Sequence, residues 1–189
     1  MMDAMGESRS RRSELHLAPP TEERRAQVLE AMRRSRDLHR PWVYPPVTAA
    51  GYDRWLARQA TPEFEGFLIL RRSDDELVGM SNLSQILGDP LRGAYLGFGA
   101  VEGYAGRGYM RAGVGLVLGE ALGRLRLHRV EANIQPQNAA SKALVSALGF
   151  VHEGYSERYL KVGGRWRDHE RWAIRAELWR AHRSVPGAV

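Results

Sequence analysis

The segment Ala105-Gly106-Arg107-Gly108-Tyr109-Met110 lies between an apolar stretch, residues 94–101, and an amphipathic stretch, residues 109–125. The first predicts a strand buried on both faces, and the second predicts a helix because its apolar residues recur at helical spacing. Backbone N–H groups of a glycine-rich turn can surround a phosphate, and the start of a helix adds partial positive charge. A side chain would block that approach, so glycine suits the position. The segment predicts a phosphate-binding turn, although a tight turn that packs a helix on a strand would have the same composition.

Two common phosphate-binding motifs do not fit this segment. A Walker loop is excluded because no Gly-Lys-Ser/Thr follows the glycines. The dinucleotide fingerprint would place its third glycine at Arg111, and the rest of the chain does not alternate strand and helix as a doubly wound sheet does. Arg107 or Arg111 could add a cationic contact to a phosphate.

The remaining sequence predicts one domain of strands and helices. Gly97 and Gly99 interrupt the strand at 94–101, which favours a bulge or the close approach of a ligand. No repeat or linker divides the chain, so we expect a basic tail over 1–12, a single domain over 13–180 and a tail over 181–189. The further strands are expected at 13–17, 67–70, 77–81, 129–135, 159–162 and 165–174, and the further helices at 22–38, 48–56 and 139–148.

Composition excludes several classes of site. The 189 residues contain no cysteine, so no disulfide, zinc-thiolate site or cysteine nucleophile can form. The six histidines lack metal-ligand spacing, and we expect no metal. No stretch approaches the roughly 18 apolar residues of a membrane span, which favours a cytoplasmic protein without a membrane partner. The formal net charge of +6 suits a phosphate-bearing ligand, whereas the dispersed arginines make a nucleic-acid partner unlikely.

At these motifs the chain resembles the GNAT (GCN5-related) N-acetyltransferase superfamily, and within it the RimJ/RimL-like branch that acetylates ribosomal-protein N-termini. The superfamily pattern is Arg or Gln, two residues, Gly, one residue, then Gly or Ala. Gly106 and Gly108 match the glycines of the loop, whereas Ala105 and Met110 depart from the pattern, and Met at the last place is familiar in this branch. Similar motifs in the same order run from Leu15 to Ile174: Arg40-Pro41-Trp42, Asn133 to Pro136, Asn138-Ala139-Ala140-Ser141, Leu148-Gly149-Phe150, Glu153-Gly154-Tyr155, Tyr159-Leu160 and Gly164 to His169.

The resemblance implies a fold and an activity. It implies an α/β (α+β) GNAT fold with about four helices and a mixed, mostly antiparallel sheet of six to seven strands that splays between strands 4 and 5. The implied activity is acetyl-CoA-dependent N-acetylation of a primary amine, foremost a protein N-terminus such as that of a ribosomal protein. A small amine as acceptor, and a non-catalytic CoA-binding protein, remain alternatives. The chain could be a monomer or a homodimer.

The same resemblance assigns residues to coenzyme A. Phe98 and Ala100 would offer backbone groups to the thioester carbonyl and the pantetheine arm, and Asn138 and Ser141 would line the other side of the cleft. The residues that would hold the diphosphate are Gly106, Arg107, Gly108, Met110 and Arg111.

Catalytic residues are harder to assign. The tyrosine that serves many members as proton donor is replaced by Val145, so Ser141 is the candidate donor, with helix capping or packing as its equally weighted alternative. Glu102 is a candidate base, although it suits a solvated carboxylate as well. A strong base is dispensable for an α-amine, whose pKa lies near 7.7–8.0 rather than near 10.4 as for lysine.

Aromatic residues could shape the acceptor pocket. Trp42, Trp166 and His169 are the candidates, with a place in the core as the alternative. Asp168 and His169 are neighbours in a predicted strand and therefore face opposite sides, which excludes a hydrolytic triad that uses both.

Overall fold

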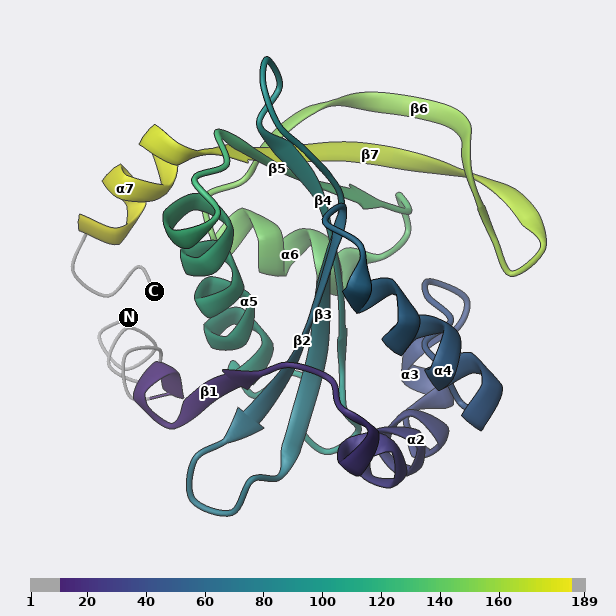
Figure 1. The fold of residues 1–189 in the computed structure, drawn as a ribbon. Coiled ribbons are helices and arrows are strands. Elements are labelled where there is room, and N and C mark those ends of the chain that lie inside the picture. Colours follow the sequence, from purple (N-terminus) through teal and green to yellow (C-terminus); the bar gives the residue numbers. More distant parts are fainter. Residues whose placement is uncertain (1–10, 185–189) are drawn as a thin grey trace.

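The computed structural model describes residues 11–184 as a single seven-stranded sheet with helices on both faces (Figure 1). The strand order is β1-β2-β3-β4-β5-β7-β6, and every neighbouring pair is antiparallel except β4 and β5. This is the mixed, mostly antiparallel sheet that the sequence predicts. The strands are β1 (Leu15–Ala18), β2 (Phe64–Arg71), β3 (Leu77–Leu87), β4 (Gly93–Ala100), β5 (Arg129–Ile134), β6 (Val151–Val162) and β7 (Arg165–Arg175).

Short 3₁₀ and π-helical turns adjoin several of the α-helices. A 3₁₀ turn at Glu22–Arg24 precedes α2, and α4 ends in another at Arg58–Ala60. The helix α5 ends in a π-helical turn at Glu120–Arg124. The α-helices are α2 (Arg25–Arg34), α3 (Arg36–His39), α4 (Ala49–Ala57), α5 (Tyr109–Gly119), α6 (Ala139–Ala147) and α7 (Ala176–Ser184).

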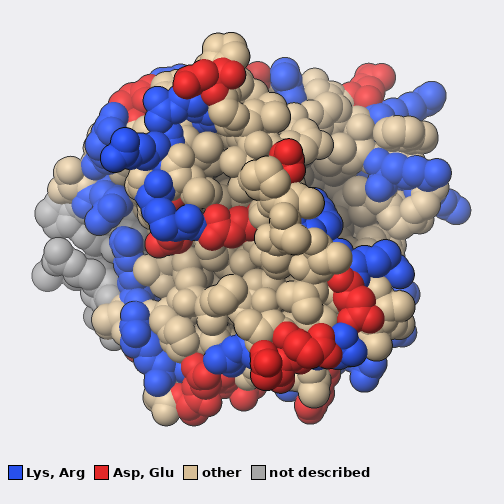
Figure 2. Space-filling model, viewed as in Figure 1, with Lys and Arg blue, Asp and Glu red and all other residues tan. Residues whose placement is uncertain are grey.

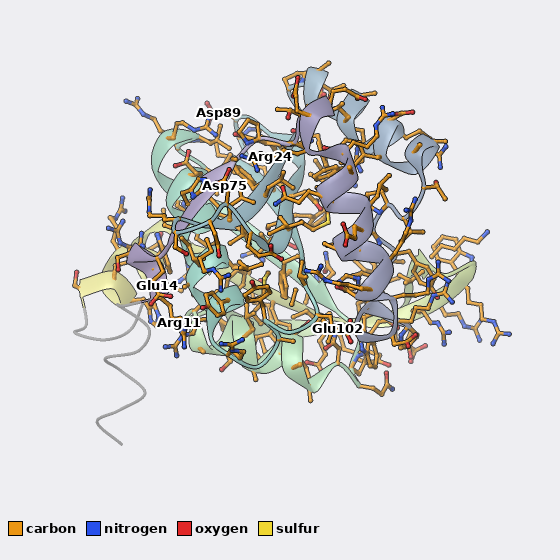
Figure 3. All side chains as sticks on the ribbon, turned by 90° about the horizontal axis from the view of Figure 1, so that it is seen from below. Arg11, Glu14, Arg24, Asp75, Asp89 and Glu102 are labelled. Atoms are coloured by element: carbon orange, nitrogen blue, oxygen red, sulfur yellow. The ribbon has the colours of Figure 1, made fainter. Side chains whose placement is uncertain are left out.

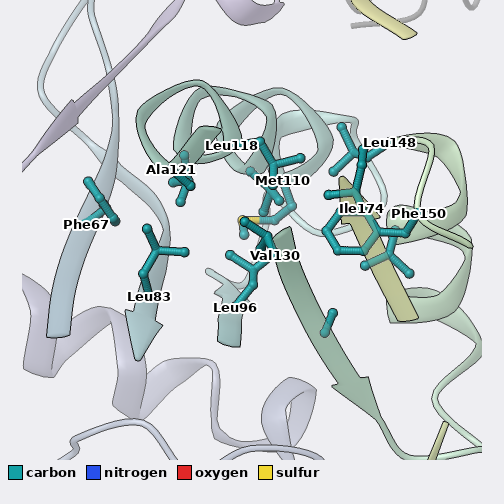
Figure 4. Close-up of a cluster of buried hydrophobic side chains, with 14 of the residues drawn as sticks. Phe67, Leu83, Leu96, Met110, Leu118, Ala121, Val130, Leu148, Phe150 and Ile174 are labelled. Atoms are coloured by element: carbon teal, nitrogen blue, oxygen red, sulfur yellow. The ribbon is translucent and has the colours of Figure 1, made fainter. Parts of the chain in front are cut away.

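Two apolar clusters cover the two faces of the sheet. In β2, Ile69 packs with α5 residues such as Leu118, while its neighbours Leu68 and Leu70 pack with α2 and α4. This alternation follows from the two-residue period of a strand. Figure 4 shows the cluster on the α5 side, where Leu96 and Val130 of the central strands meet Leu118.

The predicted helix over 22–38 is broken. Ser35 has φ −88° and ψ 9°, so α2 ends before it and α3 starts after it. The Ser35 hydroxyl donates to the carbonyl of Ala31 (2.6 Å) and accepts from the backbone N–H of Glu102 (2.8 Å). A side chain that bonds both its own helix and the backbone just after β4 fixes the break, and a helical periodicity cannot reveal it.

Three other differences concern the ends and the regularity of elements. The β6–β7 hairpin is longer than predicted, because β6 begins at Val151 rather than near residue 159. The helix α7 was not predicted and runs past residue 180, where we expected the domain to end. The register of β3 and β4 shifts near Ser84 and not at the two glycines of β4, so the expected bulge there is wrong. Most of the expected tails lie outside the described residues.

The central strands β4 and β5 separate after three residue pairs. Gly93–Tyr95 pair with Arg129–Glu131, and from Leu96 onward β4 has no partner on that side. The strand β5 continues alongside β7 as far as Ile134. The splay that the resemblance implies is therefore present, and it leaves backbone groups of β4 without a strand to bond.

Candidate functional site

A cleft of about 780 Å³ opens at the splay. Its size lies within the roughly 300–1,000 Å³ that small-molecule sites occupy. It is bounded by the chain from α3 to Val43, the end of β4, the loop before α5, and one side of α6. The lining residues are Arg11, Leu38, His39, Trp42, Val43, Phe98, Gly99, Ala100, Ala105, Gly106, Arg107, Gly108, Met110, Arg111, Asn138, Ala140, Ser141, Ala143, Leu144 and Ala147.

The backbone of β4 faces this cleft at every second residue. The N–H of Val101 donates to the carbonyl of Val78 on β3 (3.0 Å), so the odd-numbered residues of β4 bond β3. In an antiparallel ladder the residues between them point their N–H and C=O groups the other way. Phe98 and Ala100 therefore direct their backbone groups into the splay. That these groups meet a thioester stays a prediction.

The loop before α5 supplies the other end of the cleft. Gly106 and Gly108 have φ of +72° and +80°, and a Cβ on either would meet no atom within 4 Å. Gly108 is the N-cap of α5, whose first backbone N–H groups have no partner within the helix. The loop thus offers free amides and open space at a positive helix end, which fits a diphosphate.

The start of α6 forms the opposite wall. The Asn138 side chain caps the helix, since its Oδ1 accepts from the N–H of Ser141 (3.1 Å). Capping is thus the role of Asn138 and not of the Ser141 hydroxyl. Both residues line the cleft, as do all nine residues that the sequence analysis assigns to coenzyme A.

His39 belongs to the cleft and was missed from the sequence. Its Nε2 lies 2.7 Å from the carbonyl oxygen of Ala100, and because a carbonyl only accepts, Nε2 carries a proton. Its Nδ1 is buried without a partner among the described residues, and burial lowers the pKa of the ring despite the carbonyl contact. A Cβ on Gly99 would lie 3.2 Å from Nε2, so the glycine makes room for this ring. No local pattern predicts a contact that spans 61 residues.

The other predicted residues lie in three different places. Trp42 lines the cleft, and its carbonyl accepts from the Gln135 side chain (3.1 Å). Glu102 does not line the cleft; its side chain is exposed, so nothing in the geometry supports it as a base. Trp166 is 61% exposed near the turn of the β6–β7 hairpin, outside the cleft lining.

His169 is buried in the sheet and does not reach the cleft. Its Nδ1 is 3.0 Å from the carbonyl of Arg167, its ring packs edge-on against Tyr159, and burial lowers its pKa. Asp168 points the other way and accepts from the Tyr155 hydroxyl (2.6 Å). The two neighbours face opposite sides, as predicted.

Within the described part of the chain, the charged side chains that line the cleft are all basic, whereas the surface carries both basic and acidic side chains (Figure 2). The cleft lining includes three arginines and no carboxylate among the described residues. On the face drawn in Figure 2, by contrast, both signs are exposed, and Asp and Glu lie between groups of Lys and Arg. Within residues 11–184, no group of three histidine or carboxylate side chains could hold a metal ion, and no helix is long and apolar enough to cross a bilayer.

An open mixed sheet that splays beside a glycine-rich helix start defines the class of proteins that bind an acyl-coenzyme in a cleft of the sheet. The sequence agrees, because residues 14–151 match the family described as Acetyltransferase (GNAT) domain, and the chain belongs to that family.

The curated relatives cover part of the chain. A protein of Bacillus subtilis named "Probable N-acetyltransferase YjcK" is 37% identical over 108 residues, which are 57% of this chain and 60% of that protein. The [Ribosomal protein uS5]-alanine N-acetyltransferase of Escherichia coli is 31% identical over 106 residues, or 56% of this chain and 55% of the enzyme. These matches therefore span less than two thirds of the relatives.

Solved structures match over most of the chain. Mycobacterium smegmatis RimJ in complex with CoA-disulfide superimposes with a TM-score of 0.80 at 26% identity, covering 92% of this chain and 86% of that one. The spermidine N-acetyltransferase of Vibrio cholerae, in complex with CoA and spermine, has a TM-score of 0.76 at 18% identity and covers 89% and 99%. The second likeness shows the fold alone.

Proposed function

We propose that this chain is an acetyl-CoA-dependent N-acetyltransferase that acts on a primary amine. The observation that carries the proposal is that one cleft joins the unpaired backbone of β4 to the glycine-rich start of α5. The amine nitrogen attacks the thioester carbon, the C–S bond breaks, the leaving thiolate takes up a proton and the amine releases one to water. The N–H of Phe98 suits the oxyanion, because preorganised amides stabilise charge that develops in the transition state.

The acceptor that we infer is the α-amine of a peptide N-terminus, as for the E. coli relative, which acts on a ribosomal protein. A polyamine carries several positive charges and would need carboxylates to receive it, whereas the described lining of the cleft has none. An α-amine is partly neutral near pH 7, so it can react without a dedicated base.

The test is release of free CoA thiol from acetyl-CoA with four acceptors: peptides of varied first residue, Nα-acetyl-lysine, spermidine and an amino sugar. At pH 7 we expect the best peptide to exceed the lysine side chain and spermidine at least tenfold in kcat/KM. Equal or better turnover of lysine or spermidine would contradict the peptide acceptor. Binding of acetyl-CoA without thiol release across the panel would instead favour a non-catalytic CoA-binding protein.

Ser141 is the proposed proton donor to the leaving thiolate. Its hydroxyl makes no hydrogen bond within residues 11–184, and it lies on the cleft wall formed by α6. We expect Ser141→Ala to lower kcat by about 10²-fold, the lower range for general acid catalysis, with little change in the affinity for CoA. If Ser141→Ala kept the kcat and the CoA affinity of wild type, Ser141 would have no part in the mechanism.

A further inference from the structure

Arg11 reaches the cleft from a segment that carries none of the motifs discussed above. It precedes β1 and lies outside residues 14–151, over which the family match extends. Its side chain nevertheless lines the same cleft as Arg107 and Arg111. Figure 3 shows Arg11 beside Glu14 at one end of the molecule, where β1 begins.

Tyr109 fixes the position of the Arg11 side chain. The guanidinium Nη1 donates to the Tyr109 hydroxyl (2.8 Å), and the guanidinium carbon lies 4.5 Å from the centre of the same ring. The guanidinium of Arg107 lies 5.7 Å from that ring centre as well. Tyr109 is the first residue of α5 and follows the N-cap Gly108. Two cationic groups thus meet at the helix start where the loop amides are free.

The charges at this helix start are incompletely balanced. Arg11 lies 3.5 Å from the carboxylate of Glu14, and both side chains are partly exposed to solvent. Arg107 bonds the carbonyl of Gly103 (3.0 Å), and neither it nor Arg111 forms an ion pair with a residue in the range 11–184. Like charges beside a positive helix end repel one another, and a bound polyanion relieves that repulsion. Arginine also presents a planar fork that matches phosphate oxygens.

We propose that Arg11 binds a phosphate group of coenzyme A, so that the segment before β1 forms part of the cofactor site. This inference rests on the proposed function and adds to it a binding residue from outside the glycine-rich loop. Arg11 then contributes to affinity for the coenzyme and not to the chemical step.

The test compares Arg11→Gln with Arg12→Gln. Arg12 is a matched control because it is the adjacent arginine, does not line the cleft, and extends toward Gly119 at the far end of α5. In calorimetry with CoA we expect Arg11→Gln to raise Kd about tenfold, which is the typical loss for one charge-assisted hydrogen bond. For Arg12→Gln we expect Kd to change by no more than about twofold. For Arg11→Gln we expect KM for acetyl-CoA to rise about tenfold as well, and for Arg12→Gln we expect both KM and kcat to stay within about twofold of wild type.

Two further measurements separate phosphate binding from a structural role. Arg11→Lys keeps the charge and loses the fork, so its Kd should fall between those of wild type and Arg11→Gln. The dependence of log Kd on log salt concentration should be shallower in Arg11→Gln, because one phosphate contact is lost. Thermal unfolding of each variant identifies any loss of affinity that comes from unfolding.

Dephospho-CoA identifies the phosphate. An equal loss for CoA and dephospho-CoA in Arg11→Gln places Arg11 at the diphosphate, and a loss confined to CoA places it at the 3′-phosphate. Affinity unchanged for both ligands, or reduced equally in Arg12→Gln, overturns the inference while leaving the proposed function intact. A wild-type protein that binds neither ligand removes the proposed function and this inference together.

Discussion

Gly106 and Gly103 share a backbone conformation and differ in where they lie. Both have positive φ, +72° and +86°, and neither would place a Cβ within 4 Å of another atom. Only Gly106 lines the cleft. Substitution by alanine should therefore cost each variant a similar backbone strain of about 1–2 kcal/mol, while only the new methyl group at position 106 would obstruct a phosphate.

The corresponding experiment pairs Gly106→Ala with Gly103→Ala. We expect the urea midpoint of unfolding to fall by a similar amount from wild type in both variants. Only Gly106→Ala should bind CoA at least about tenfold more weakly than wild type. Calorimetry and urea unfolding measure the two effects separately. Equal CoA affinity in the two variants would mean that the loop does not approach the ligand.

His39 predicts how stability changes with pH. Burial lowers the pKa of its ring in the folded protein below the unfolded value near 6.5, so the unfolded state takes up a proton first as pH falls. The stability is therefore full above about pH 6.5 and declines below it, by at most about 1.4 kcal/mol per pH unit for this residue. His169 is buried in the same way and adds a decline of the same sign.

Urea unfolding between pH 7.5 and 5 measures this decline. We expect the free energy of unfolding of His39→Gln to depend less on pH than that of wild type, because glutamine can still donate to the carbonyl of Ala100 and does not titrate. The double variant with His169→Gln should flatten it further. If the free energy of unfolding fell equally with pH below 6.5 in wild type and in the double variant, burial would hold neither ring neutral.

Short segments of this chain were predictable where local chemistry decides the structure. The starts of α4 and α6, the glycine turn before α5 and the alternation in β5 are set by residues close in sequence, and they were located to within a residue or two. The break at Ser35 was not predictable, because the side chain bonds the backbone N–H of Glu102, 67 residues away and just after β4. The amphipathic α7 was overlooked, although its buried Trp179 gives it an apolar side.

Two helix caps allow stability and binding to be separated at the scale of elements. Asn138 Oδ1 caps α6 and Thr48 Oγ1 caps α4, each accepting a backbone N–H at 3.1 Å. Replacing either with alanine should cost about 1 kcal/mol. Because only α6 forms a wall of the cleft, we expect Asn138→Ala to weaken CoA binding several-fold and Thr48→Ala to leave it unchanged.

Chemical unfolding and calorimetry of the two variants give the comparison. A loss of CoA affinity in Thr48→Ala as large as in Asn138→Ala would show that general loosening, and not the position of α6, controls the site. Asn138→Asp keeps the cap and should restore stability, so any affinity that it fails to restore reflects the exchange of an amide for a carboxylate at the cleft.

Taken over the whole molecule, all nine residues predicted for the coenzyme line one cleft, whereas of the three residues predicted for the acceptor only Trp42 does. The nine predicted coenzyme residues converge because they lie on two short segments and one strand whose order the resemblance supplies. His39 and Arg11 reach the cleft from distant segments, through contacts with Ala100 and Tyr109 that only the folded chain creates. Trp166 and His169 lie outside the cleft, because the β6–β7 hairpin takes them away from the splay.

The two apolar clusters on opposite faces of the sheet should unfold as one unit. The strand β2 contributes Ile69 to one cluster and Leu68 to the other, so neither helical layer can separate without exposing one side of the same strand. Leu118 on the α5 side and Leu68 on the α2 side are fully buried. Replacing either with alanine should destabilise the protein by about 2–5 kcal/mol through lost burial and the cavity that remains.

The prediction is that both variants shift a single transition. Tryptophan fluorescence reports all five tryptophans of the chain, among them Trp55 on the α2 side and Trp179 on the α5 side, and circular dichroism reports the helices and the sheet together. In wild type and in both variants, the two signals should change at the same urea concentration, as expected for a domain that unfolds in one step. If Leu68→Ala produced an earlier fluorescence change with the ellipticity of the sheet retained, the layer of α2 and α4 would be an independent unit. The position of His39 against β4 would then depend on a layer that opens before the rest of the sheet.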